Sequence, residues 1–256
     1  GITITPEGEE FLQYARRIIS QVEEVEEIYK NDRRPKQHFS VCVPRASYIA
    51  CAFADFAKSI RRDIPTEIFY KETNSRRTVN NVVKGDSDLG IVRFQSAFEK
   101  YFESMFEEKH LNAEIITEFK YRLLMSKEHP LAKKKTICCK DLAPYIEISH
   151  ADPYVPSLPL TDVKKEELSG SVDKHIYIFE RGSQFGLLQS VTDSFMWVSP
   201  VPKEIYEQYN LTERVCEDND KVFLDVLIYR NGYKLSELDS AFITEVCNSK
   251  RKYLTV

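Results

Sequence analysis

The sequence lacks an excess of positive charge and any apolar run long enough to cross a membrane. Its 256 residues carry 36 Lys and Arg against 40 Asp and Glu, a formal net charge of -4, whereas a domain that grips nucleic-acid phosphates by itself is usually basic. A membrane helix needs roughly 20 consecutive apolar residues. A signal peptide needs a basic segment before a hydrophobic one, and the acidic N-terminal region shows neither. We therefore expect a cytoplasmic protein with no membrane contact, whose residues shown here need not touch DNA.

Motifs typical of enzymes and metal sites are also missing. The sequence contains no Gly-x-Ser-x-Gly, no glycine-rich phosphate loop and no His-Glu-x-x-His. It has no Cys-x-x-Cys pair and no His/Cys cluster at metal-ligand spacing. The cysteines are Cys42, Cys51, Cys138, Cys139, Cys216 and Cys247. We expect buried, reduced thiols, with no enzymatic activity, metal or cofactor. A redox role stays open, although adjacent cysteines rarely reach disulfide geometry.

What is present begins with a predicted helix. Thr5 can cap its first amides, Pro6 suits the first helical position and Glu7 faces the positive end of the dipole. Apolar residues then recur at steps of four and three, the a/d seam of a coiled coil. These residues are Phe11, Ala15, Ile18, Val22, Val25 and Tyr29. The seam predicts a dimerisation helix that ends in the charged segment 31–35. An amphipathic helix packed on its own domain stays an alternative.

Short apolar strands alternating with helices follow this segment. The predicted order is strand 39–43, helix 47–60, strand 67–71, a helix through Val79, Val82 and Val83, and strand 89–92. This βαβαβ order is the signature of a parallel sheet covered by helices. Gly85 lies where a helix C-terminal glycine is expected.

A second set of elements begins near Tyr121. It contains predicted strands at 121–125, 145–148, 176–180 and 195–198, and then a strand at 222–229, a turn at Asn231-Gly232 and an amphipathic helix at 236–246. Two similar α/β lobes are therefore predicted. From the pattern alone, the last helix could return to either lobe.

Four segments in order resemble the LysR-type family of bacterial transcription regulators. Thr5-Pro6-Glu7-Gly8 before the heptad helix is similar to the junction between that family's winged helix-turn-helix and its linker helix. Gly85-Asp86-Ser87-Asp88-Leu89-Gly90-Ile91 and His129-Pro130-Leu131-Ala132, with Asp141-Leu142 after it, resemble elements of its sensor lobes. Tyr229-Arg230-Asn231-Gly232-Tyr233, with Phe242, resembles its terminal strand and helix.

This resemblance implies an α/β fold of two Rossmann-like lobes with periplasmic-binding-protein type II architecture, preceded by a long dimerisation and linker helix. Residues 1–35 would be the end of the wing and the linker helix. Residues 36–118 with about 230–256 would form lobe I, and 119–229 lobe II. The resemblance also implies a homodimer or homotetramer that senses a small organic anion in the inter-lobe cleft. Promoter DNA would be bound through the winged helix-turn-helix, most of which would precede Gly1.

Segment 191–198 departs from the family, because it lacks the glycines usual before the last strand of the second lobe. Two other functions stay open. One is a solute-binding receptor that feeds a transporter, which should be exported and monomeric. The other is a sensor-like fold whose cleft is filled by side chains and which acts only through protein partners.

Candidate effector-binding residues lie beyond the predicted strand ends. In open α/β sheets, ligands bind at the carboxyl ends of strands, where helix N-termini present free amides to anions. Hydroxyl and amide side chains there can donate to a carboxylate, and arginines can add charge-assisted contacts. Matching positions in the resembled family often line the effector cleft. The candidates are Arg45, Ser47, Thr73, Asn74, Arg93, Phe94 and His150.

Six of the seven candidates have a plainer interpretation. Ser47, Thr73 and Asn74 can simply cap helices, and the two arginines can be solvated surface charges. His150 can be a satisfied or exposed histidine, although its ordinary pKa would let it tune anion binding near neutral pH.

Overall fold

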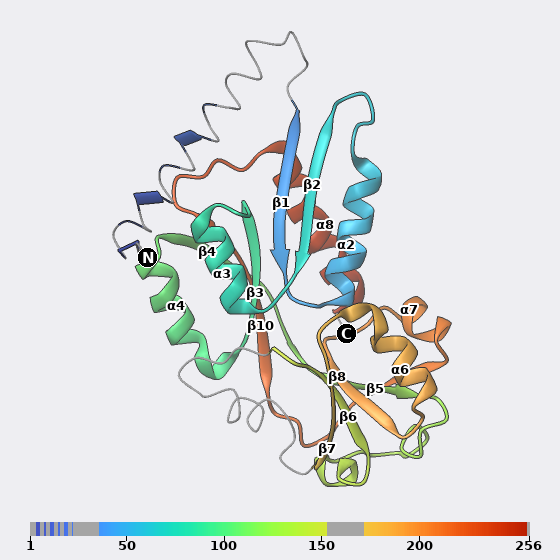
Figure 1. The fold of residues 1–256 in the computed structure, drawn as a ribbon. Helices are drawn as coiled ribbons and strands as arrows, with labels where there is room; N and C mark the ends of the chain where they lie inside the picture. Colours follow the sequence, from blue (N-terminus) through green and yellow to red (C-terminus); the bar gives the residue numbers. More distant parts are fainter. Residues whose placement is uncertain are drawn as a thin grey trace.

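The computed structural model describes residues 36–152 and 172–254, together with positions 4, 5, 8, 11, 12, 15, 18, 19 and 22. These residues form two five-stranded sheets with strand orders β2-β1-β3-β10-β4 and β7-β6-β8-β5-β9. Each sheet is the centre of one lobe (Figure 1). The predicted two-lobed α/β fold is confirmed.

Lobe I has helices on both faces of a mixed sheet. Its elements are β1 Gln37–Val43, α2 Ser47–Ser59, β2 Thr66–Glu72, α3 Ser75–Lys84, β3 Leu89–Gln95, η1 Ser96–Phe98, α4 Glu99–Glu108, β4 Leu111–Lys120, β10 Val222–Arg230 and α8 Glu237–Tyr253. β1 is parallel to β2 and β3, whereas β10 runs antiparallel to β3 and β4. The three strands of the βαβαβ segment are therefore parallel, as predicted. The sheet as a whole is mixed, because β10 enters it from the distant end of the chain.

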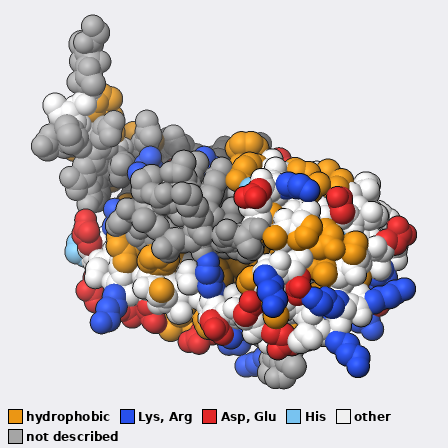
Figure 2. All heavy atoms as spheres, turned by 90° about the horizontal axis from the view of Figure 1, so that it is seen from below, with side chains coloured by type: hydrophobic (Ala, Val, Ile, Leu, Met, Phe, Trp, Pro, Cys, Tyr) orange, Lys and Arg blue, Asp and Glu red, His pale blue; other side chains and the backbone are white. Residues whose placement is uncertain are grey.

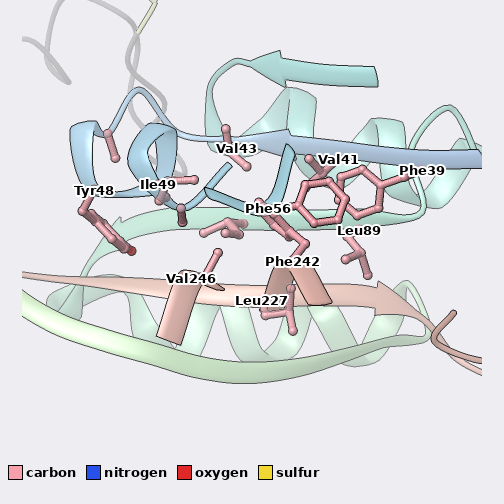
Figure 3. Close-up of a cluster of buried hydrophobic side chains, with 13 residues drawn as sticks. Phe39, Val41, Val43, Tyr48, Ile49, Phe56, Leu89, Leu227, Phe242 and Val246 are labelled. Atoms are coloured by element: carbon pink, nitrogen blue, oxygen red, sulfur yellow. The ribbon is translucent and has the colours of Figure 1, made fainter. Parts of the chain in front are cut away.

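Side chains alternate across the lobe I sheet and supply two cores. Leu89 and Ile91 of β3 join the core under α2 and α8, while Val92 of the same strand joins the core under α3 and α4. On the first face, Phe39 of β1 lies with its ring centroid 4.8 Å from that of Phe56 of α2, and the side chains converge between the sheet and the two helices (Figure 3). The lobe I sheet is therefore covered by one core on each face.

Lobe II is built on a second mixed sheet. Its elements are β5 Arg122–Ser126, η2 Cys139–Leu142, β6 Ile146–His150, β7 Lys174–Ile178, η3 Arg181–Ser183, α6 Gln184–Ser190, β8 Ser194–Val198, α7 Lys203–Gln208 and β9 Leu211–Arg214. α6 and α7 cover one face, where Leu124 and Met196 are buried. The other face packs against the loop that contains η2, through Leu142. Helices therefore cover the first face, and a loop with one short 3-10 helix covers the second.

Two crossovers join the lobes, at Tyr121 between β4 and β5 and at 215–221 between β9 and β10. The side chain of Asn219 in the second crossover donates to the Tyr121 carbonyl at 3.0 Å, so the crossovers contact each other.

The predicted end of lobe II at residue 229 lies too late in the sequence, because β10 pairs between β3 and β4 in the lobe I sheet. The last helix returns to lobe I, where Ser249 of α8 donates to the Tyr48 carbonyl of α2 at 2.6 Å.

The predicted N-terminal helix begins as expected. The Thr5 hydroxyl accepts a hydrogen bond from the Gly8 amide at 3.1 Å, and all described positions from 8 to 22 are helical. Phe11, Ile18 and Val22 of the seam are 70%, 61% and 51% exposed, so this part of the seam is not packed on its own lobes. Ala15 is half-buried. Val25 and Tyr29 lie outside the described residues.

The described surface mixes charges of both signs. In the view from below, Lys and Arg side chains lie among Asp and Glu side chains and do not form one continuous basic patch on this face (Figure 2). No helix in the described ranges combines the length and the apolar character that a membrane span requires.

Candidate functional site

The candidate site lies where the carboxyl ends of β1 and β2 in lobe I meet the carboxyl ends of β6 and β7 in lobe II. Arg45 follows β1, Asn74 follows β2, Asp152 follows β6 and Arg181 follows β7. The contacts between the two lobes join residues more than 70 positions apart in the sequence. The fold, not local sequence, therefore assembles this site.

Asp152 of lobe II is held by three side chains of lobe I. Arg45 donates to its two carboxylate oxygens at 2.8 and 3.4 Å, and Arg77 donates to Oδ2 at 3.1 Å. The Asn74 side-chain amide donates to the Asp152 carbonyl at 3.0 Å. The side chains of Arg45 and Asp152 are only 13% and 15% exposed, so this pair is screened less than a surface pair. Arg45 also donates to the Phe179 carbonyl at 3.1 Å.

Arg181 of lobe II makes a second bridge in the opposite direction. Its Nη1 donates to Glu72 Oε1 at 2.9 Å and its Nη2 donates to the Ser47 hydroxyl at 2.9 Å. The two side chains of the ion pair are 17% and 20% exposed. Each lobe thus contributes an arginine to the other lobe's carboxylate.

The ion pairs at this boundary contain more positive than negative groups. Three guanidinium groups, of Arg45, Arg77 and Arg181, meet two carboxylates, of Asp152 and Glu72. The N-cap of α2 is Ala46, which offers no side-chain cap, and neither α2 nor α3 has an acidic residue in its first turn. Helix N-termini carry partial positive charge and free amides. A carboxylate or phosphate brought to this boundary would find both guanidinium and amide donors.

Arg93 and Phe94, two predicted site residues, lie in the interior of lobe I. Arg93 makes a bidentate ion pair with Asp225 of β10 at 2.7 and 2.6 Å, and Tyr48 donates to the same carboxylate at 2.6 Å. Burial alone would lower the pKa of Arg93, but the charge and hydrogen bonds of Asp225 raise it. Phe94 stacks on Phe102 of α4 at a centroid distance of 4.1 Å. The structure therefore does not bring these two side chains to the inter-lobe contacts.

Asn74 caps a helix and contacts the other lobe at once. Its Oδ1 accepts from the Arg77 amide at 2.9 Å, which is the predicted N-cap bond of α3, while its amide group reaches Asp152. Ser47 is the first residue of α2 and accepts from Arg181. Thr73 is buried, with its amide bonded to the Val43 carbonyl at 2.8 Å. Capping and inter-lobe contact are therefore compatible in this site.

His150 is half-buried at the end of β6, and its Nδ1 is a buried atom with no hydrogen-bond partner. Burial, and next the positive charge of Arg45, lower its pKa to about 4. It is therefore neutral near pH 7, which removes the expected role of tuning anion binding by titration in that range.

Four residues of the site were missed in the sequence, namely Glu72, Arg77, Asp152 and Arg181. Glu72 is the last residue of β2 and Asp152 comes two residues after β6, but acidic side chains at strand ends were not expected to face an anion. Arg181 comes directly after the predicted strand 176–180, so the rule on strand ends that selected Arg45 and Arg93 would have selected it as well. Arg77 lies inside α3, and only its position opposite Asp152 identifies it.

The sequence matches no protein-family model and no curated protein sequence. Solved structures do match. The effector-binding domain of QuiR in complex with shikimate gives a TM-score of 0.55 at 17% identity, over 85% of this chain and 98% of that one. The regulatory domain of MetR, a LysR family regulator from N. meningitidis, gives 0.57 at 10% identity, over 85% and 94%.

A full-length protein matches over nearly the whole chain. Full-length BenM gives a TM-score of 0.56 at 15% identity, covering 97% of this chain and 78% of that one. At these identities the likeness concerns the fold. The two lobes therefore have the fold of the regulatory, effector-binding domains of LysR family regulators, as the sequence resemblance predicted.

Proposed function

We propose that this chain is the effector-binding and dimerisation region of a cytoplasmic LysR-type transcription regulator, and that it senses a small organic anion between its lobes. The observation that carries the proposal is the surplus of guanidinium groups where the strand ends of both lobes meet. The start of α2, which has no side-chain cap, lies in the same loops, as does the start of α3, which has no acidic residue in its first turn. Carboxylates are the ligands such groups prefer.

An anion would act by competing with protein carboxylates. It would take guanidinium donors from Asp152 or Glu72 and so change the angle between lobes that these pairs now bridge. A ligand shifts such an equilibrium only by its differential affinity for the two arrangements. The residues that touch the ligand are inferred to be Arg45, Ser47, Thr73, Asn74, Arg77, Arg181 and His150, with Arg93 and Phe94 supporting them from inside lobe I.

The N-terminal helix would carry this change to the rest of the protein. Its seam residues Phe11, Ile18 and Val22 are exposed and would pack against the same helix of a second copy. Promoter DNA would be bound by a winged helix-turn-helix N-terminal to this helix. In the whole protein, an effector should therefore alter the footprint on promoter DNA.

Thermal unfolding with small carboxylates tests the ligand step. Shikimate is a suitable first probe because QuiR, with the same fold, binds it, and shikimate methyl ester is the matched uncharged control. An acid that binds the folded chain should stabilise it by about 2.7 kcal/mol when its free concentration is 100 times its dissociation constant. Arg45→Ala should lose that shift, while Arg61→Ala, at an exposed pair with Asp63 outside the site, should keep it.

Other outcomes would support other functions. If no carboxylate of a broad panel shifts the midpoint of unfolding, a fold that acts only through protein partners is favoured. If acids bind but sedimentation shows a monomer at all concentrations, a solute-binding receptor is favoured. Ile18→Glu should convert a dimer into a monomer without loss of ligand binding, because the seam lies outside the site.

A further inference from the structure

Two thiols and a carboxylate gather on lobe II, away from the inter-lobe contacts. Cys139 Sγ lies 3.7 Å from Cys216 Sγ, and Cys216 Sγ lies 3.2 Å from Asp218 Oδ1. All three ligand atoms lie within 4.8 Å of one another. Cys139 begins η2, and the other two residues lie in the 215–221 crossover. The proposed sensing mechanism does not use this cluster.

We propose that Cys139, Cys216 and Asp218 form a binding site for a divalent ion that prefers thiolates, Zn²⁺ above all. In a tetrahedral site with Zn–S bonds of about 2.3 Å, two sulfurs stand about 3.8 Å apart. The observed separation of 3.7 Å matches this value without movement of either backbone. A disulfide would require the sulfurs to approach to about 2.05 Å.

The carboxylate is already held in a position to coordinate. The Cys139 amide donates to Asp218 Oδ1 at 2.8 Å, which orients the side chain toward the sulfurs. Such supporting hydrogen bonds to ligands are typical of metal sites. Cys216 is buried and Asp218 is exposed, so an ion can enter from solvent and keep water as its fourth ligand.

The ligand set suits a divalent ion by charge. When the ion binds, it displaces the protons of both thiols and offsets the negative charge of the two sulfurs and the carboxylate.

An ion at this position would link the crossover to the body of lobe II. Cys216 and Asp218 lie in the segment that leads into lobe I, and Asn219 beside them contacts the other crossover. The ion would fasten this segment to η2. If the chain works as the sensor proposed above, the ion would restrict the lobe motion that the effector drives.

Cobalt substitution tests the site directly in the purified chain under reducing conditions. Co²⁺ should give a thiolate-to-cobalt charge-transfer band and the visible bands of tetrahedral cobalt, saturating at one ion per chain, and Zn²⁺ should remove them. This readout needs no effector and no DNA, so it can fail or succeed independently of the proposed function. Absence of the bands from the intact, reduced chain would overturn the proposal.

Variants assign the ligands. Cys139→Ser and Cys216→Ser should lose the charge-transfer band, and Asp218→Asn should bind Co²⁺ about tenfold or more weakly. Cys138→Ser is the matched control, because this cysteine adjoins Cys139 but lies outside the cluster, and it should keep the band. Bands that persist unchanged in Cys216→Ser would contradict the assignment.

A measurement on the unmutated chain covers variants that fail to fold. Zn²⁺ should slow alkylation of Cys139 while the neighbouring Cys138 reacts at an unchanged rate. Equal rates with and without Zn²⁺ would reject the site. Rapid formation of a Cys139–Cys216 disulfide with a mild oxidant, in a chain that shows no cobalt band, would make the cluster a redox pair instead.

Discussion

The two lobes handle buried charge in opposite ways. In lobe I, the buried carboxylate of Asp225 accepts two bonds from Arg93 and one from Tyr48. In lobe II, Glu147 of β6 is 0% exposed, and neither of its carboxylate oxygens has a hydrogen-bond partner. The nearest cationic candidate is His175, whose Nδ1 lies 3.9 Å from Oε2. Lobe I therefore pairs the buried carboxylate of Asp225 with a cation, whereas lobe II leaves the buried carboxylate of Glu147 without hydrogen bonds.

Other buried polar atoms follow the same division. Among the described residues, the buried side-chain atoms without a partner are Thr78 Oγ1 in lobe I and His129 Nε2, both Glu147 oxygens, Ser149 Oγ, His150 Nδ1, His175 Nδ1 and Trp197 Nε1 in lobe II. Each such atom costs free energy of folding, because it has lost water without gaining a hydrogen bond. We infer that lobe I is the rigid partner and lobe II the one whose stability changes with conditions.

The largest expected effect comes from Asp225→Asn. Removing the charge leaves the Arg93 guanidinium buried and uncompensated, which should lower the free energy of unfolding by about 3–5 kcal/mol. Urea denaturation measures this change. Asp220→Asn is the control, because Asp220 pairs with Lys120 at an exposed site, and it should change little. Equal losses in the two variants would remove the contrast between a buried and a surface pair.

The next effect is a dependence of stability on pH in lobe II. Burial raises the pKa of Glu147 to about 8, so between its ordinary value and pH 8 the folded chain binds a proton that the unfolded chain has lost. This stabilisation is complete at acid pH and is lost as pH rises through that window, by up to about 1.4 kcal/mol per pH unit. Glu147→Gln should flatten the slope and leave the chain more stable at pH 8.

Urea denaturation at several pH values measures this slope. Glu118→Gln, at an exposed position of β4 in lobe I, is the control and should leave the slope as it is. A slope that survives in Glu147→Gln would mean that Glu147 is not responsible for it.

Glycine substitutions sharpen the comparison of packing. A Cβ at Gly90 in lobe I would lie 2.7 Å from Thr78 Cγ2 and 2.9 Å from Val82 Cγ2, so Gly90→Ala should cost about 1–3 kcal/mol. Adding Thr78→Ser removes the nearest methyl group and should recover part of the loss. Gly186→Ala in α6 of lobe II meets nothing within 4 Å and should stabilise by about 0.5–1 kcal/mol. A thermal midpoint that falls for Gly186→Ala would contradict this difference.

The smallest change in stability is expected where the lobes meet. Asp152→Ala removes the partner of Arg45 and Arg77. Arg77 is exposed, and Arg45 lies at the boundary between the lobes, where water can reach it once the lobes part, so the loss should be about 1 kcal/mol. The lobes should separate more readily, and small-angle scattering should show a larger radius of gyration. Asp63→Ala, in a surface pair within lobe I, should leave the radius unchanged. An unchanged radius in Asp152→Ala would mean that this bridge does not hold the lobes.

Most regular elements could be predicted from sequence, because each depends on neighbours along the chain. The strand at 39–43, the helix that starts at Ser47 and the glycine that ends α3 all agree with the structure. Gly85 has a φ of 79° and its amide bonds the carbonyls of Asn81 and Val82, as a helix-ending glycine should. Alternation and capping are local signals, and they were sufficient here.

The candidate site could be predicted only in part. Arg45, Ser47 and Asn74 were found from the rule on strand ends, and all three contact lobe II. Arg93 satisfied the same rule but is turned into lobe I by a buried acid that lies 132 residues further along the chain. Nothing in the sequence around Arg93 shows that Asp225 will be placed there.

By itself, the sequence determined the alternation of strands and helices, the two-lobed class and the helical start of the N-terminal segment. Periodicity and capping encode these features within a few residues. Only the tertiary structure decided that β10 enters the first sheet, that Arg45 bridges to Asp152 and that Cys139 meets Cys216. These pairings join segments 77 or more residues apart, and their energy depends on how whole sheets pack, which no local pattern contains.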